Sequence, residues 1–231
     1  MSRVHRFYVG NDFELKHSFW LHDQRLIHQW NKVLRYQAGQ NVLLFDGVET
    51  DRLYKILEIK PDEAHLELIT DYERQLPKKN VYLLWSLLKK DKNDWVLQKA
   101  TELGVTHFIP LLAERSEKTG FDVERAHRIV IEAAEQCGRS DIPNVREQML
   151  VKTAIDHIGE KVPMVVCEQG GAIPEPAKSD TCGVLIGPEG GWSDAERELF
   201  EQHVIPHLGL GDFTLRAETA AVTAAGKLLS L

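Results

Sequence analysis

Gly187-Pro188-Glu189-Gly190-Gly191 follows a short apolar run, residues 182–186, and precedes Ser193-Asp194-Ala195-Glu196. The apolar run is typical of a buried strand, and the Ser193 to Glu196 pattern is that of a capping box that opens a helix. Glycines between the two allow positive φ angles and let bare backbone N–H and C=O groups approach a ligand closely. The stretch predicts a strand, a tight turn and a helix, which is the local pattern of an α/β fold.

A second motif, Leu215-Arg216-Ala217-Glu218-Thr219-Ala220, lies further along the chain. Arg216 and Glu218 stand there among small and apolar residues, where the start of a buried helix is expected. Charged side chains rarely occupy such positions without a partner or a task. A double glycine by itself usually marks only a sharp turn. With the second motif added, we expect the two motifs to form two halves of one small-molecule site.

The pattern around these motifs divides the chain into two domains. Residues 1–72 contain short strand signals separated by turns, with a helical patch at 24–34, and predict a small barrel-like domain. Residues 73–80 are polar and contain Pro77, as expected of a linker. In residues 81–231 strands at 81–88, 106–112, 163–168 and 181–186 alternate with helices at 91–103, 122–139, 193–203 and 218–231. This alternation predicts a mostly parallel sheet whose ligands bind at the carboxyl ends of the strands.

Composition excludes several classes of protein. With 231 residues and 43% hydrophobic content the chain can bury a core, and its formal net charge of −7 argues against a general nucleic-acid binder. No apolar run approaches a membrane span and the start lacks the apolar centre of a secretory signal, so we expect a cytoplasmic protein. The three cysteines are far apart and the histidines have no metal-binding spacing, so we expect no metal. The glycine signatures of dinucleotide folds and phosphate loops, and the serine elbow of hydrolases, are missing.

Five ordered motifs resemble those of the ribosomal RNA small subunit methyltransferase E family of SPOUT methyltransferases. They are Thr101-Glu102-Leu103-Gly104-Val105, Ile109-Pro110, residues 132–139, residues 186–191, and Leu210-Gly211 through residues 215–220. Arg6-Phe7, His28, Val33-Leu34-Arg35 and Gly39 extend the resemblance to nearly the whole chain.

The resemblance implies a PUA-like, RNA-binding β-barrel followed by a SPOUT α/β domain with a trefoil knot. It also implies S-adenosyl-L-methionine as methyl donor, a homodimer, and methylation of uridine N3 in the 16S RNA of the small ribosomal subunit. The residues that would bind the cofactor are Cys167, Glu168, Ile186, Gly187, Pro188, Gly190, Gly191, Leu210, Gly211, Leu215, Arg216 and Thr219.

Methyl transfer to uridine N3 requires loss of a proton and a stabilised anion. Glu189 and Glu218 are candidate bases, neither preferred, and Arg115, Arg139 or Arg216 could stabilise the anion. The expected RNA contacts are Arg3, Arg6, Arg35, Arg52, Lys89, Arg115, Gln136 and Arg139, with Lys90 and Lys92 beside them; ordinary surface charge is an equal interpretation for those in the barrel and for the three lysines.

The chain departs from the family at two positions. Phe213 stands where the family commonly has arginine, and Ala217 where it often has threonine. The missing arginine removes a cation that would contact RNA or the partner subunit. Two other functions stay open at this point: an RNA-binding assembly factor without turnover, and a small-molecule enzyme that uses the Gly187 loop for a nucleotide.

Overall fold

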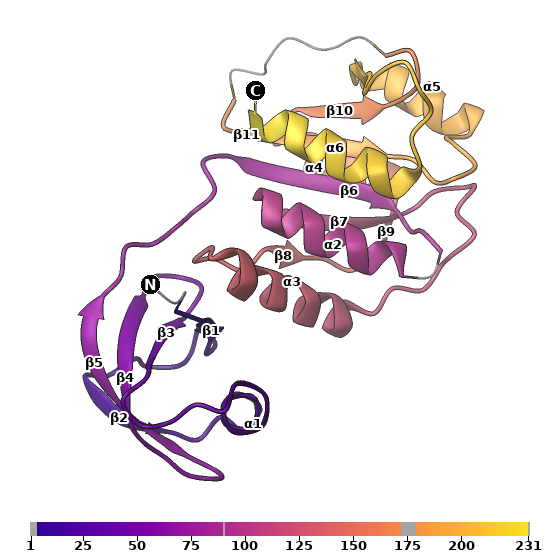
Figure 1. Cartoon of the computed structure of the whole chain (residues 1–231). Helices are drawn as coiled ribbons and strands as arrows, with labels where there is room; N and C mark the ends of the chain where they lie inside the picture. The colour runs from indigo at the N-terminus through magenta and orange to yellow at the C-terminus, as the bar shows by residue number, and fades with distance from the viewer. Residues whose placement is uncertain (1–3, 90, 172–178, 231) are drawn as a thin grey trace. The chain divides into compact units, whose positions relative to one another are not determined.

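The computed structural model describes residues 4–89, 91–171 and 179–230. Its contacts group into two compact units (Figure 1). The first comprises the chain up to Leu76 together with Ala134–Ile142, and the second Pro77–Ala133 together with the chain from Pro143. Arg3 and Lys90, which the sequence analysis named as RNA contacts, lie outside the described residues.

The first unit is built on a five-stranded sheet in the order β1-β3-β4-β5-β2. Its strands are β1 (Arg6–Tyr8), β2 (Ser18–Leu21), β3 (Asn41–Phe45), β4 (Asp51–Ile59) and β5 (Ala64–Asp71). The β1 and β3 pair is parallel and the other pairs are antiparallel. Register shifts between β4 and β5 mark β-bulges, which bend a sheet. The predicted β-rich domain is confirmed, although β2 was not assigned from sequence.

A helical segment between β2 and β3 covers the core of this sheet. It begins as α1 (Gln24–His28), capped by the Asp23 carboxylate, and continues as a π-helical turn, η1 (Gln29–Leu34). The segment ends at Arg35, whose φ of 53° is left-handed. Leu26, Ile27 and Trp30 are buried against Phe7 and Tyr54. The helix predicted at residues 24–34 is therefore present, with a change of helix type halfway.

The second unit contains a seven-stranded sheet in which all strand pairs are parallel. Its order is β12-β10-β11-β6-β7-β8, and β9 also pairs with β7. The strands are β6 (Asn80–Ser86), β7 (His107–Leu112), β8 (Asn144–Val145), β9 (Met149–Leu150), β10 (Met164–Cys167), β11 (Thr181–Ile186) and β12 (His207–Leu208). The predicted parallel sheet is confirmed.

The helices of this unit are α2 (Lys92–Leu103), α3 (Val123–Cys137), α4 (Val151–Ile158), α5 (Asp194–Gln202) and α6 (Ala217–Ser230). Helices α2 and α6 pack on one another, and α6 also covers β6 and β11. Residues of α4 and α5, such as Ile155 and Phe200, share a buried cluster with Val166 and Leu185 of the sheet. The sequence analysis did not assign α4, although Val151, Ala154, Ile155 and Ile158 have helical spacing and are all buried.

Candidate active site

A cavity of about 650 Å³ lies in the second unit, at the carboxyl ends of β10, β11 and β12. Parallel pairing places Cys167 opposite both Ile186 and Leu208, so three loops leave the sheet at one edge. Ligands of parallel sheets bind at such edges. We call this the strand-end cavity, and its two principal loops the 186–192 wall and the 210–216 wall.

Close packing holds the 186–192 wall in place. A Cβ atom added at Gly187 would lie 3.1 Å from the Trp192 ring, so only glycine fits without displacing the indole. Trp192 is 2% exposed, packs edge-on against Phe200 and donates a hydrogen bond to the Cys167 carbonyl at 3.4 Å. Gly191 has a φ of 69°, which favours glycine. The wall is thus a rigid turn with its backbone open to the cavity.

The predicted capping box after this turn is confirmed. The Ser193 side chain accepts from the Glu196 backbone N–H, and the Glu196 carboxylate accepts from the Ser193 N–H at 2.8 Å. Glu196 also accepts from the Glu114 backbone N–H at 3.0 Å, which ties the start of α5 to the loop after β7. These bonds fix where α5 begins and hence where the wall ends.

The loop after β10 brings a carboxylate to the cavity. One oxygen of Glu168 accepts from Arg197 Nε at 2.7 Å, and the other lies 3.0 Å from His207 Nδ1. The neighbouring Cys167 thiol is half-buried, and burial raises the pKa of this thiol to about 11. Cys167 is therefore a neutral wall residue, whereas Glu168 is an oriented, hydrogen-bonding one.

The 210–216 wall is anchored at its start and exposed beyond it. A Cβ atom at Gly209 would lie 2.0 Å from the Gly171 carbonyl oxygen, so the two backbones touch. Lys227 of α6 donates to the Gly209 carbonyl at 3.0 Å. Past this anchor Gly211, with a φ of 134°, and the residues up to Thr214 are exposed, and the Phe213 side chain is 85% exposed.

Lys92 at the start of α2 links two carboxylates from different segments, Glu189 of the 186–192 wall and Glu218 in the first turn of α6. Its Nζ lies 3.2 Å from Glu189 Oε1 and 3.2 Å from Glu218 Oε2. The hydrogen bond to Glu189 and the nearby Glu218 carboxylate raise the pKa of the Lys92 ammonium. Burial works against ionisation of Glu189, but hydrogen bonds from backbone N–H groups and from Lys92 outweigh it, so the pKa of that carboxyl is lowered. At neutral pH Lys92 and Glu189 are therefore both charged.

Glu218 differs from Glu189 in how its carboxylate is satisfied. Its side chain is more buried, and Oε2 makes an ion pair with Lys92 but forms no hydrogen bond among the described residues. Arg216 is exposed and lines the cavity, and its side chain has no partner within residues 4–89, 91–171 and 179–230. The Arg216 guanidinium therefore keeps bonding capacity toward a ligand in the cavity. Of the two candidate bases, Glu189 is among the residues that line the cavity and Glu218 is not.

Most of the predicted cofactor residues line the strand-end cavity: Cys167, Glu168, Ile186, Gly187, Pro188, Gly191, Leu210, Gly211, Leu215 and Arg216. Two do not. Gly190 lies against Arg115, whose Nη1 donates to its carbonyl at 3.3 Å, and Thr219 is exposed on the first turn of α6. Ala217 and Ala220 of the second motif also line the cavity, as do residues that were not predicted as cofactor contacts: Lys92, Gln169, Trp192, Arg197, Phe213 and Thr214. Trp192 was detectable as an aromatic residue directly after the glycine turn.

The predicted RNA contacts fall into two groups. Several are engaged within the protein: Arg6 binds Asp51 and Ser140 and is 9% exposed, and Arg139 binds Asp141 and is 6% exposed. Arg52 pairs with Asp71, and Lys89 with Glu117. Arg35, Arg115 and Gln136 are exposed. The exposed group is the better placed to reach a nucleic acid.

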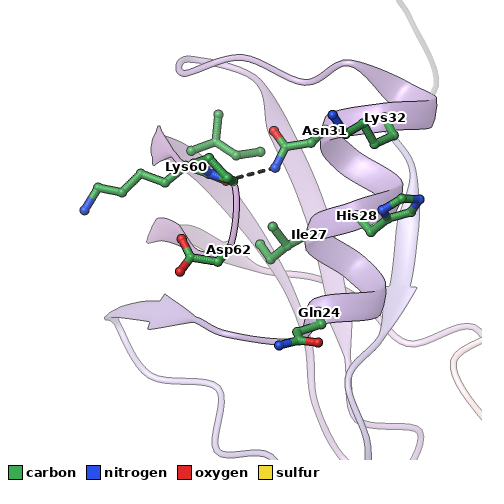
Figure 2. Close-up of a pocket in the computed structure, with 9 residues that line it drawn as sticks. Gln24, Ile27, His28, Asn31, Lys32, Lys60 and Asp62 are labelled. Atoms are coloured by element: carbon green, nitrogen blue, oxygen red, sulfur yellow. Dashed lines mark hydrogen bonds between the residues drawn. The ribbon is translucent and has the colours of Figure 1, made fainter.

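A second cavity, of about 490 Å³, lies in the first unit between the α1–η1 segment and the turn after β4. Figure 2 shows Ile27 and Asn31 facing this turn, and the Asn31 amide donates to the Lys60 carbonyl at 2.9 Å. Gln24, His28 and Lys32 are exposed, and their side chains form no hydrogen bond or ion pair with another described residue. Their polar groups are open to a ligand.

The described ranges contain no helix long and apolar enough to span a bilayer. They also contain no cluster of three or more His, Cys, Asp or Glu side chains suited to a metal ion.

Comparison with known proteins identifies the family of this chain. Residues 74–229 match the family described as RNA methyltransferase domain, and residues 32–69 the family described as RNA methyltransferase PUA domain. Ribosomal RNA small subunit methyltransferase E of Bacillus subtilis is 30% identical over 86% of this chain and 84% of its own length. The chain belongs to the ribosomal RNA small subunit methyltransferase E family.

Solved structures agree with this membership. The ribosomal RNA small subunit methyltransferase E of Neisseria gonorrhoeae, solved bound to S-adenosyl methionine, is 26% identical, with a TM-score of 0.89 over 99% of this chain and 98% of that one. A methyltransferase of Legionella pneumophila, in complex with the bound cofactor SAM, is 27% identical, with a TM-score of 0.87 over 99% and 98%. The mixed α/β fold with a PUA-like unit is therefore that of ribosomal RNA small subunit methyltransferase E. The trefoil knot stays a prediction.

Proposed function

We propose that this chain transfers a methyl group from S-adenosyl-L-methionine to N3 of one uridine in the 16S RNA of the small ribosomal subunit. The observation that carries the proposal is the strand-end cavity, where three loops, an oriented carboxylate and an unpartnered arginine converge in a protein of this family. The uridine and the N3 position come from the family resemblance.

The residues of the cavity suit this cofactor. Its volume lies in the range of small-molecule sites. Ile186, Leu210 and Leu215 offer apolar contact to an adenine, and the bare backbone at Gly187 and Gly211 offers hydrogen bonds. The Glu168 carboxylate is held by Arg197 in an orientation that suits ribose hydroxyls or a cationic group. Cys167, Pro188, Gly191 and Arg216 complete the lining.

When bound, S-adenosylmethionine supplies an electrophilic methyl group on a positively charged sulfur. The protein must then accept the N3 proton and stabilise the uridine anion. We assign proton acceptance to Glu218, because Glu189 already accepts hydrogen bonds from Lys92 and from backbone N–H groups. Lys92 holds Glu218 in place with an ion pair, and Arg216 stabilises negative charge on the uridine oxygens.

The first unit is proposed to grip the RNA around the target. Arg35 and Lys32 are exposed cations there, and the cavity of Figure 2 adds open polar groups from Gln24 and His28. Phosphate contacts position a protein on RNA, whereas an unpaired base needs hydrogen-bonding edges. The negative net charge fits a substrate that is a structured particle with local patches. We further propose that the active form is a homodimer in the cytoplasm.

The decisive experiment uses small subunits that lack the modification. They are incubated with labelled S-adenosylmethionine and either the wild-type protein or the Arg216→Ala variant, and the label is located by mass mapping of the RNA. We expect one N3-methyluridine with the wild type and at least a ten-fold lower rate with the variant. Cofactor binding without any transfer would favour an assembly factor, and no heat of binding at millimolar cofactor would exclude the methyltransferase.

A further inference from the structure

Phe213 is the most exposed large hydrophobic side chain among the described residues, at 85%. It nevertheless lines the strand-end cavity, together with Thr214 and Leu215. Its neighbours Gly211, Asp212 and Thr214 are exposed as well. Burial of a phenyl ring against a partner is favourable, so an exposed ring that lines a cavity can bind a flat apolar partner there.

The two aromatic residues of the cavity have different tasks. Trp192 is almost fully buried, packs on Phe200, and its indole N–H donates a hydrogen bond to the Cys167 carbonyl. Its ring is part of the protein core and supports the turn at Gly187. Phe213 takes part in no ring pair or cation–π contact with described residues and has no hydrogen-bonding group to satisfy. Both faces of its ring are free to meet a flat partner.

We propose that Phe213 stacks on the target uracil and holds it over the methyl-transfer site. This inference rests on the proposed function and names the residue that positions its substrate. A base taken out of its helix loses its stacking neighbours, and enzymes that act on such a base replace them with an aromatic or apolar side chain. The ring lies on the exposed 210–216 wall, on the side of the cavity that is open to solvent.

The cofactor adenine is the competing partner for the ring. The buried side of the cavity, formed by Ile186, Pro188 and Trp192, already offers the adenine apolar contact. Arg216, which is three residues away and also exposed, is placed to stabilise the same uracil as an anion. Phe213 and Arg216 together would present one flat face and one cation to the base, which matches a uracil that loses its N3 proton.

Three variants separate stacking from simple bulk: Phe213→Ala, Phe213→Leu and Phe213→Trp. Stacking of one base on an aromatic ring changes binding by roughly ten- to a hundred-fold. We expect Phe213→Ala and Phe213→Leu to raise KM for the small subunit by at least ten-fold, with the dissociation constant of S-adenosylmethionine unchanged within two-fold. Phe213→Trp should keep the wild-type KM.

A direct readout does not depend on turnover. In the Phe213→Trp variant, with S-adenosylhomocysteine present, a short uridine-rich RNA should quench the added indole fluorescence, measured as the difference from the wild type. No quenching, or a KM that does not change in Phe213→Ala, would overturn the proposal. A raised cofactor dissociation constant alone would assign the ring to adenine, and a changed oligomeric state would assign it to a subunit interface.

Failure of the proposed function is distinguishable from failure of this inference. If the wild-type protein transfers no methyl group to small subunits, the methyltransferase assignment fails whatever the variants do. If the wild type is active and Phe213→Leu is as active as Phe213→Trp, the function stands and the stacking role is wrong.

Discussion

The two walls of the strand-end cavity differ in how firmly they are held. In the 186–192 wall the buried Trp192 ring packs on the core, and Gly187 has no side chain to displace it. The 210–216 wall is held at Gly209, and residues 211–214 beyond it are exposed to solvent. A rigid surface suits a ligand whose shape does not vary, such as a cofactor. An exposed one suits a partner that brings its own surface, such as RNA. Four predictions test this difference, and the effects expected decrease from the first to the last.

The anchor of the 210–216 wall should be its least tolerant point. In Gly209→Ala the added Cβ would lie 2.0 Å from the Gly171 carbonyl oxygen, so one backbone must move. We expect a loss of more than about 3 kcal/mol in the free energy of unfolding, or failure to fold, because overpacking here involves main chain on both sides. The measurement is urea unfolding. Gly120→Ala is the control, because no atom lies within 4 Å of its added Cβ; equal midpoints for the two variants would show that the wall has no such anchor.

The two carboxylates should differ in their effect on the chemical step. Glu218→Gln removes the proposed base and should lower the single-turnover rate by about a hundred-fold or more, as general bases do. Glu189→Gln should lower it less than about ten-fold, since that carboxylate is already engaged by Lys92 and by backbone N–H groups. The opposite order would move the base to the 186–192 wall.

The 186–192 wall should lose stability and cofactor affinity when its close packing is disturbed. Gly187→Ala places a Cβ 3.1 Å from the Trp192 ring, which should cost about 1–3 kcal/mol and raise the dissociation constant of the cofactor about ten-fold. Trp192→Phe, added to Gly187→Ala, removes the ring atoms that clash and should recover part of the affinity. Calorimetry with S-adenosylmethionine measures both effects. If the second change lowers affinity further, Gly187 acts through its backbone conformation instead.

Lys92 joins the 186–192 wall to α6, and its removal should change the pH dependence of stability. Without the ammonium the pKa of Glu189 rises toward its ordinary value, so the acid limb of the stability profile, measured by urea unfolding, should move to higher pH in Lys92→Met, with Lys92→Arg as the control. Glu189 contributes stability above its unfolded pKa and loses it as pH falls through the folded pKa, whereas Lys92, with a raised pKa, loses its contribution only in strong alkali. The stability difference from the wild type should therefore be present near pH 7 and fade in acid. Superimposable profiles would mean that Lys92 is a bystander.

Much of the fold could be predicted because its signals are local. The parallel sheet follows from strand and helix alternation, and the capping box at Ser193 marks the start of α5 within four residues. The elements that were missed give weak signals: β8, β9 and β12 are two-residue strands whose existence depends on neighbours distant in sequence. Sequence could not show that Ala134–Ile142 contact the first unit, because the bonds of Ser140 to Asp51 and Arg6 join residues far apart.

The site divides in the same way. Motif residues such as Gly187 and Leu215 were predicted because the family pattern names them. Lys92 was predicted as an RNA contact or ordinary surface charge, and nothing local reveals that the carboxylates of Glu189 and Glu218 converge on it. Arg6 and Arg139 carry the charge expected of RNA contacts, yet each is nearly buried and already paired with a carboxylate, Arg6 with Asp51 and Arg139 with Asp141. Charge is visible in a sequence, but the pairing of charges is a property of the fold.

The strand order also determines when each part of the parallel sheet can form during synthesis of the chain. Strand β11 lies between β10 and β6, so β10, although synthesised earlier, has no place in the sheet until β11 has emerged. The touching backbones at Gly171 and Gly209 and the hydrogen bond from Lys227 need segments that are later still. Domains fold during synthesis from the N-terminus onward, and non-local parallel pairing is slow. The strand-end cavity should therefore be completed only after the segment up to Lys227 has emerged from the ribosome.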